Sequence, residues 1–189
     1  MRASLVAMLV GVLAATLGAD PLAAQAVVTK EKPLDPARAA IRDTLVVFRD
    51  TLHAVAAAGE RFNRDLRTTS DASVLARARA VRTACERSRR DIPVARRVVG
   101  GSSWTEPNRT RRQRELLQAL GDLDKVLGRC IDQFGAMAEK AGEARGYGPG
   151  RTERLRADLL RFHEALKRYL GSLGIRLDPP GVHRSPLAG

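Results

Sequence analysis

The chain has few of the residues that most often perform chemistry or stack on bases. Its 189 residues include three histidines, two cysteines and one tryptophan, and aromatic residues make up 4% of the total. Most of these aromatics stand within repeating apolar patterns, so stacking platforms for single-stranded nucleic acid are missing. We therefore expect no nucleic-acid partner.

Sequence motifs of known catalytic centres are also absent. The chain has no P-loop, no Gly-x-Gly-x-x-Gly after a strand pattern and no serine elbow. It has no Cys-x-x-Cys-His for covalent haem, and no Glu is followed by a His three residues later, as di-iron bundles require. We expect a protein that is not an enzyme and has no cofactor or metal. An enzyme with a surface site remains an alternative, for which no residue can be nominated.

Long apolar runs are missing beyond the first residues. Arg2, the apolar run 5–19 and the small-x-small sequence Ala24-Gln25-Ala26 predict a signal peptide over residues 1–26. Cleavage near Ala26 would place the protein in the periplasm or outside the cell. Because a bilayer span needs about 20 apolar residues, we expect no transmembrane segment after signal removal. An uncleaved, membrane-anchoring N-terminus is the alternative.

Strand patterns have almost no support, and helical patterns take their place. Apolar residues recur at alternating spacings of four and three over Ile41–Leu66, Val74–Val99, Leu116–Ala141 and Leu155–Leu173. Each row forms an apolar seam along one helix face. Four comparable seams can bury one another, which predicts an all-α, antiparallel up-down-up-down four-helix bundle over residues 35–177. An extended two-helix coiled coil in a dimer is the alternative.

Turn and capping residues divide the chain further. Residues 27–34 are expected to be a flexible leader, and Asp35-Pro36 should cap and begin the first helix. The Pro- and Gly-rich residues 178–189 are expected to be a disordered tail.

Glycine and proline also predict interruptions inside this region. Pro93 lies inside the second seam, which predicts a kink or break after Asp91. The glycines and proline of residues 146–150 predict a helix breaker, and Thr152 would then cap the fourth helix.

The two cysteines both fall on seams. In an oxidising compartment Cys85 and Cys130 are expected to form one disulfide between the second and third helices. Two buried free thiols are the alternative.

Lysine is scarce although the chain is strongly basic. The sequence has 33 Lys and Arg against 21 Asp and Glu, a net charge of +12, and only five of the basic residues are lysines. Arginine favours bidentate contacts with carboxylates and phosphates, although a GC-rich genome would produce the same bias.

Nine arginines late in the second helix and early in the third should meet at one end of the bundle, beside Trp104. We call them the arginine cluster: Arg87, Arg89, Arg90, Arg96, Arg97, Arg109, Arg111, Arg112 and Arg114. Such a cluster could bind an acidic protein, a polysaccharide or an anionic lipid surface. A solvated surface balanced by nearby Asp and Glu is the alternative.

The seams contain no Asp, Glu, His or Lys, and Ser88 and Tyr169 are their only polar members. His53 and His163 each follow a seam residue and could share a level, where they could bridge a metal or haem. Two unrelated, partly exposed histidines are the alternative.

The small seam residues Gly59, Ala78 and Ala141 should gather at the end opposite the arginine cluster. If they leave a cavity there, its lining would be Phe62, Phe134, Met137 and Leu155. Close approach of the helices is the alternative, because protein interiors pack densely.

These observations favour an exported, non-catalytic helical bundle that binds or scaffolds an acidic envelope partner through its arginine-rich end. The alternative is a carrier of a small ligand, haem or metal, at the His53/His163 level or in an apolar pocket at the small-residue end.

Overall fold

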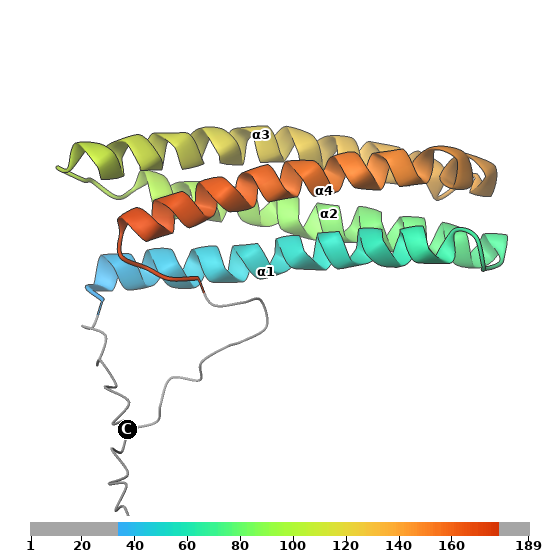
Figure 1. The fold of residues 1–189 in the computed structure, drawn as a ribbon, viewed down its shortest axis with the longest axis horizontal. Helices are drawn as coiled ribbons and strands as arrows, with labels where there is room; N and C mark the ends of the chain where they lie inside the picture. Colours follow the sequence, from blue (N-terminus) through green and yellow to red (C-terminus); the bar gives the residue numbers. More distant parts are fainter. Residues whose placement is uncertain (1–33, 178–189) are drawn as a thin grey trace, which may run out of the picture. The chain divides into compact units, whose positions relative to one another are not determined.

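The computed structural model describes residues 34–177 of the chain. The expected signal peptide, the expected tail and all of the expected leader except Leu34 lie outside the described residues. Residues 34–177 form four α-helices and no strand: α1 Pro36–Asp65, α2 Asp71–Gly100, α3 Pro107–Met137 and α4 Ala141–Ser172. The four helices lie side by side (Figure 1), which confirms the all-α class and the number of helices.

Local signals in the sequence explain where most of the helices begin and end. The Asp35 side chain accepts a hydrogen bond from the Arg38 amide at 2.9 Å, and Pro36 occupies the first turn of α1, as predicted. Ser70 caps α2 in the same way. After α4 the backbone turns at Gly174, whose φ of 75° suits glycine, and the Ile175 amide then donates to the Leu170 carbonyl.

The apolar seams form the core as the spacing predicts. Every seam residue of α1 and α2 is buried, and so are all six of α4. On α3 the buried row runs from Leu116 to Met137. Ala141 is the exception, because the chain leaves α3 after Met137 and Ala141 is the first residue of α4. The expectation that Ala141 belongs to the third seam is therefore wrong.

The glycine-rich segment 146–150 does not break the helix. α4 begins at Ala141 and continues through Pro149, so Thr152 lies inside the helix and is not its cap. Thr152 is buried, with its hydroxyl 2.9 Å from the Pro149 carbonyl and 2.7 Å from the Asn63 side-chain oxygen of α1. Tertiary contacts thus support a helix that local propensity disfavours.

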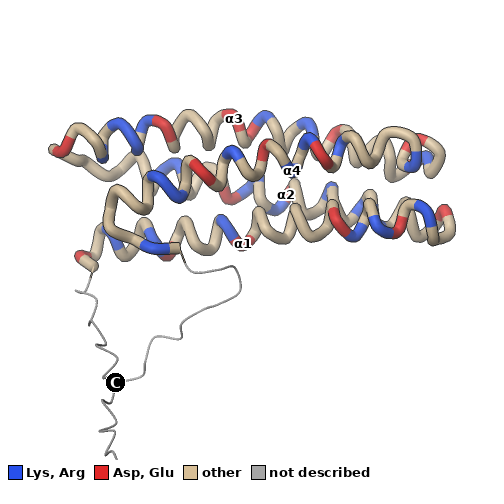
Figure 2. Tube along the Cα trace, in the orientation of Figure 1, with Lys and Arg blue, Asp and Glu red and all other residues tan. Residues whose placement is uncertain are grey.

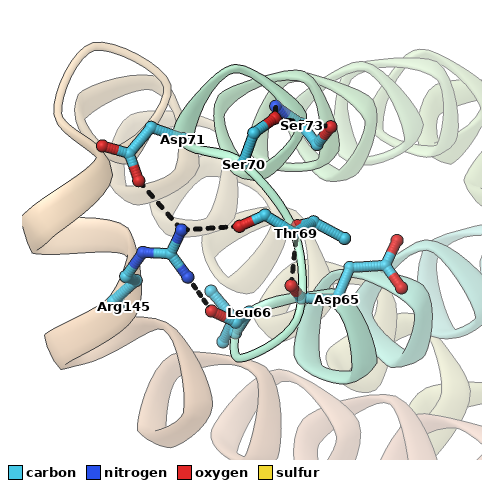
Figure 3. Close-up of polar contacts among 7 residues, drawn as sticks. All are labelled: Asp65, Leu66, Thr69, Ser70, Asp71, Ser73 and Arg145. Carbon is cyan, nitrogen blue, oxygen red and sulfur yellow. Dashed lines mark hydrogen bonds and ion pairs between the residues drawn. The ribbon is translucent and has the colours of Figure 1, made fainter.

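Arg145 anchors the start of α4 to the turn between α1 and α2 (Figure 3). Its guanidinium donates to the carbonyl of Leu66, to the carbonyl of Thr69 at 2.9 Å and to the Asp71 carboxylate at 2.8 Å. Leu66 is the C-cap of α1, so one side chain satisfies acceptors at the end of one helix and in the following turn.

Pro93 also lies within an unbroken helix. α2 extends from Asp71 to Gly100, so the break considered after Asp91 does not occur. Pro93 is exposed, whereas the seam residues Ile92 and Ala95 beside it are buried. Packing of the seam thus continues past the proline.

The predicted disulfide is present. Cys85 of α2 and Cys130 of α3 are bonded, with their Cα atoms 6.3 Å apart and 45 residues between them in sequence. Both cysteines are buried. The bond joins the middle of α2 to the last third of α3, well away from the connection formed by residues 101–106.

A second regularity pairs arginines of α2 with glycines of α3. The side chains of Arg82, Arg89 and Arg96 are spaced by seven residues, and they lie against a matching series: Gly135, Gly128 and Gly121. Residue numbers rise along α2 as they fall along α3, so the pairs run in reverse order. The missing glycine side chains leave room for the arginine guanidinium groups to lie against the neighbouring helix.

Candidate functional site

The arginine cluster is longer than the sequence suggested. Arg96, Arg97 and the four arginines of α3 lie toward one end of the fold, but Arg87, Arg89 and Arg90 lie farther along α2. Ten to thirteen residues separate this second group from Gly100, which corresponds to about 15–20 Å of helix. The nine residues therefore form a band along α2 that reaches the start of α3.

Four members of the arginine cluster are neutralised by acidic neighbours. Arg89 of α2 pairs with Asp124 of α3 at 2.8 Å, and Arg109 pairs with Glu106 at 2.7 Å. The two others, Arg111 and Arg112, share the carboxylate of Glu115. A hydrogen bond from Arg112 holds the pKa of Glu115 below its usual value. The pairs with Glu115 are Arg112 at 2.7 Å and Arg111 at 3.9 Å.

The remaining five members have no ion pair within residues 34–177. They are all exposed: Arg87, Arg90, Arg96, Arg97 and Arg114. Figure 2 shows basic and acidic residues interspersed along the helices. Three carboxylates therefore face the nine arginines of the cluster.

Arg109 and Trp104 make a fixed contact at the end of the fold. The guanidinium lies 5.6 Å from the centre of the Trp104 ring and donates to the Ser172 carbonyl of α4 at 3.1 Å. Nearby, the buried Gln113 side chain donates to the carbonyls of Val99 and Ser102, each at 2.6 Å. These contacts hold the α2–α3 connection, so Arg109 has a structural role.

Sequence analysis did not single out Gln113, although the pattern contains a signal for it. Gln113 stands three residues before Leu116, where the third seam would place its next member. A polar residue at a seam position beside a loop is suited to bind loop carbonyls.

A second candidate site lies between α1 and α4, which contact one another far less than sequential helices do. A groove of about 330 Å³ opens there, and we call it the α1–α4 groove. Its apolar lining is Leu52, Val55, Ala56, Gly59, Leu155, Leu159, Leu160, Phe162 and Leu166. Its polar lining is Arg49, His53, Glu60, Asn63, Thr152, Glu153, Arg156 and His163.

His53 and His163 share a level, as their positions in the sequence suggested. Their ring centres are 6.3 Å apart and the rings are nearly perpendicular. Burial lowers the pKa of His53, and the positive charges of Arg49 and His163 lower it further, whereas Asp50 raises it. This end of the groove therefore has an electropositive environment and holds a histidine that favours its neutral form.

The interior contains a charged group that the seam pattern did not predict. Arg49 follows Phe48, which packs on Phe162 of α4, and is only 3% exposed. Its guanidinium is paired with the partly buried Asp50 carboxylate at 2.8 Å. The expectation of an interior without titratable groups is wrong at this position, and Thr152 and Gln113 extend the buried polar set beyond Ser88 and Tyr169.

The pocket expected at the small-residue end has a different lining. Phe62 and Phe134 pack edge to face with their ring centres 5.4 Å apart, and both are buried. Of the four lining residues expected, only Leu155 lines the α1–α4 groove, together with the small residue Gly59. The structure therefore brings part of the expected apolar pocket and the histidine pair into one groove.

The described part of the chain has neither a metal-site grouping nor a membrane-spanning helix. Among residues 34–177, no three His, Cys, Asp or Glu side chains are grouped as a metal site would need. None of the four helices has an apolar stretch long enough to cross a bilayer.

Any proposal of a function for this chain rests on its fold and its two candidate sites. No protein-family model, no curated protein and no solved structure matches this chain. Within residues 34–177 the fold is all-α, with four helices and one disulfide between α2 and α3.

Proposed function

We propose that this chain is an exported, non-catalytic binding protein whose helices form an antiparallel up-down-up-down bundle. The reversed order of the arginine–glycine pairs supports opposite directions for α2 and α3. Sequential helices pack on one another and α1 also packs on α4, which suits a closed ring of four helices. The signal-like residues 1–26 and the Cys85–Cys130 disulfide support export.

The proposed partner is acidic and binds the arginine cluster. One observation carries this proposal: five exposed arginines of the cluster have no ion pair within the described chain, although acidic residues neutralise the other four. Exposed guanidinium groups in this number attract carboxylate, phosphate or sulfate groups and can bind them through paired donors. An acidic protein, an anionic polysaccharide and an anionic lipid surface share that chemistry.

The test measures binding to vesicles of phosphatidylcholine with and without phosphatidylglycerol, and to alginate, over a series of salt concentrations. We expect binding only to the anionic probes, and we expect it to weaken steeply as salt rises. The triple variant R90Q/R97Q/R114Q should reduce the affinity by at least about tenfold.

A control variant removes the same charge elsewhere. Arg61, Arg64 and Arg154 are exposed and make no ion pair within residues 34–177. The variant R61Q/R64Q/R154Q should bind nearly as well as the native chain. Equal losses in both variants would mean that net charge alone attracts the probes, and binding that is insensitive to salt would contradict the proposal.

A second candidate function is carriage of a small ligand, which the α1–α4 groove favours. Its volume of about 330 Å³ lies at the lower end of the range for small-molecule sites, about 300–1,000 Å³. Native mass spectrometry of the purified protein tests this function. A mass above that of the polypeptide, with or without a visible absorbance band, would support carriage, and a consistently bare polypeptide would contradict it.

A further inference from the structure

The α1–α4 groove is long and narrow. Its lining on α1 extends from Arg49 to Asn63, and its lining on α4 extends from Leu166 back to Thr152. Fourteen residues of helix correspond to about 21 Å. A volume of about 330 Å³ spread over that length suits a linear chain better than a compact ring system.

Apolar side chains form the middle of the groove. Leu52, Val55, Leu155 and Leu159 are buried core residues that also line it. On the α1 side, Ala56 and Gly59 leave the groove open, because neither has a side chain longer than a methyl group. Leu160 lines the groove while 57% exposed, so an apolar occupant would cover a large side chain that otherwise contacts water.

The polar residues lie toward the ends. The histidine pair and Arg49 lie at one end, and Glu60, Asn63, Glu153 and Arg156 lie toward the other. Arg49 and His163 bring positive charge close to His53, and the Asp50 carboxylate that pairs with Arg49 offsets part of it. The imidazoles of His53 and His163 carry N–H donors that suit an anionic head group, whereas the other end carries two carboxylates beside Arg156.

We propose that the α1–α4 groove binds a long-chain fatty acid, with its acyl chain along the apolar middle and its carboxylate at His53 and His163. The proposal rests on the second candidate function, carriage of a small ligand, and names its chemical class. The carboxylate accepts hydrogen bonds from the two imidazoles beside Arg49. The acyl chain covers Leu160 and lies over Ala56 and Gly59.

Calorimetric titration of the delipidated full chain with saturated fatty acids of increasing length tests this class. We expect affinity to rise by up to about fourfold for each added methylene until the groove is filled, which is the burial free energy of a methylene expressed as a ratio. The primary alcohol with the same chain as the longest acid should bind more weakly. Equal affinity for acid and alcohol, or no dependence on chain length, would overturn the proposal.

Two matched variants locate the site. A56F places a phenyl ring in the groove and should weaken fatty-acid binding at least tenfold. A54F places the same ring on an exposed residue outside the groove and should leave fatty-acid binding unchanged. L160E changes an exposed residue, so it keeps the test valid if A56F does not fold, and it should also weaken binding. Native affinity in A56F or L160E would overturn the assignment.

The double variant H53A/H163A tests the head-group end. It should weaken binding of the acid about tenfold and leave binding of the alcohol unchanged, since a charged hydrogen bond is lost in only one case. Equal losses for both probes would overturn the role given to the histidines.

Other occupants of the groove give different results. A stable dimer that A56F dissociates would show that a second copy covers the groove, and fatty-acid binding seen only after removal of residues 178–189 would show that this segment occupies it. Either result overturns the proposal. If native mass spectrometry instead finds a neutral ligand that A56F excludes, the fatty-acid class is wrong while carriage stands.

Discussion

Gly148 of α4 lies against Phe62 of α1 more closely than any side chain would allow. A Cβ atom placed on Gly148 would come within 2.5 Å of a Phe62 ring carbon. Both residues are buried, and Phe62 itself packs on Phe134 of α3. The contact therefore joins three helices at the end where Arg145 also anchors α4.

Substitution of Gly148 by alanine should destabilise the protein. The added methyl group must displace a packed aromatic ring, and overpacking of this kind costs about 1–3 kcal/mol. Urea denaturation measures the change in the free energy of unfolding. Gly146 and Gly150 have no neighbour within 4 Å of an added Cβ, so G146A and G150A should stabilise α4 by about 0.5–1 kcal/mol. A G148A protein as stable as G146A would refute the close contact.

Removal of the Cys85–Cys130 disulfide should lower stability substantially. The bond closes a loop of 45 residues, for which the chain-entropy relation gives about 4 kcal/mol. We expect the variant C85A/C130A to unfold at a lower denaturant concentration than the oxidised native protein. The same shift should appear when the native protein is reduced. The alanine pair also tests packing, because both cysteines are buried. An unchanged midpoint after complete reduction would contradict the expectation.

Substitution of Arg145 should loosen the junction of α1, α2 and α4. R145A removes donors from the Leu66 and Thr69 carbonyls, and loss of charge-assisted hydrogen bonds costs about 1.5–3 kcal/mol. R145K should recover little, because a lysine cannot present the forked donors. D71N is the matched control: it removes only the ion pair of an exposed carboxylate and should cost less than about 1 kcal/mol. Thermal denaturation that ranks D71N below R145A would count against this role.

His53 should make stability depend on pH. Its pKa is lowered in the folded protein, first by burial and then by the charges of Arg49 and His163. The unfolded chain therefore binds a proton at His53 more readily than the folded protein does. The stability that the neutral His53 contributes is fully present above the ordinary histidine pKa of 6.5. It is lost as pH falls from that value through the lower pKa of the folded state. We expect the free energy of unfolding to decline over that interval.

The measurement is urea denaturation at steps from about pH 7.5 to about pH 5, above the range in which ordinary carboxylates titrate. H53Q should flatten the decline, whatever its effect on stability at neutral pH. H183Q removes a histidine outside the described residues and should leave the slope as in the native chain. An H53Q protein with the native slope would show that another group causes the decline.

The helix faces could be read from the sequence because burial repeats with the period of the helix. The spacings of four and three placed Leu45, Val81 and Leu127 in the core, and the structure buries all three. The same reasoning placed Cys85 and Cys130 within bonding distance. Each of these predictions depends on the position of a residue along its own helix and on one neighbouring helix.

Predictions that relied on local propensity were less successful. Residues 146–150 have a composition that disfavours helix, yet Gly148 beneath Phe62 and the anchored Arg145 keep α4 continuous. The buried Arg49 was missed for a related reason, because its position beside the seam does not reveal that its guanidinium is enclosed by the fold with Asp50.

The sequence by itself determined the four apolar seams, the disulfide partners and the surplus of arginine, because each is a property of residue order and composition. Only the tertiary structure decided which arginines remain without an ion pair, since Asp124 reaches Arg89 from another helix. It also decided where the helices separate. Gly148 and Arg145 hold α1 and α4 together at one end. Farther along, the small side chains of Gly59 and Ala56 leave the space of the α1–α4 groove.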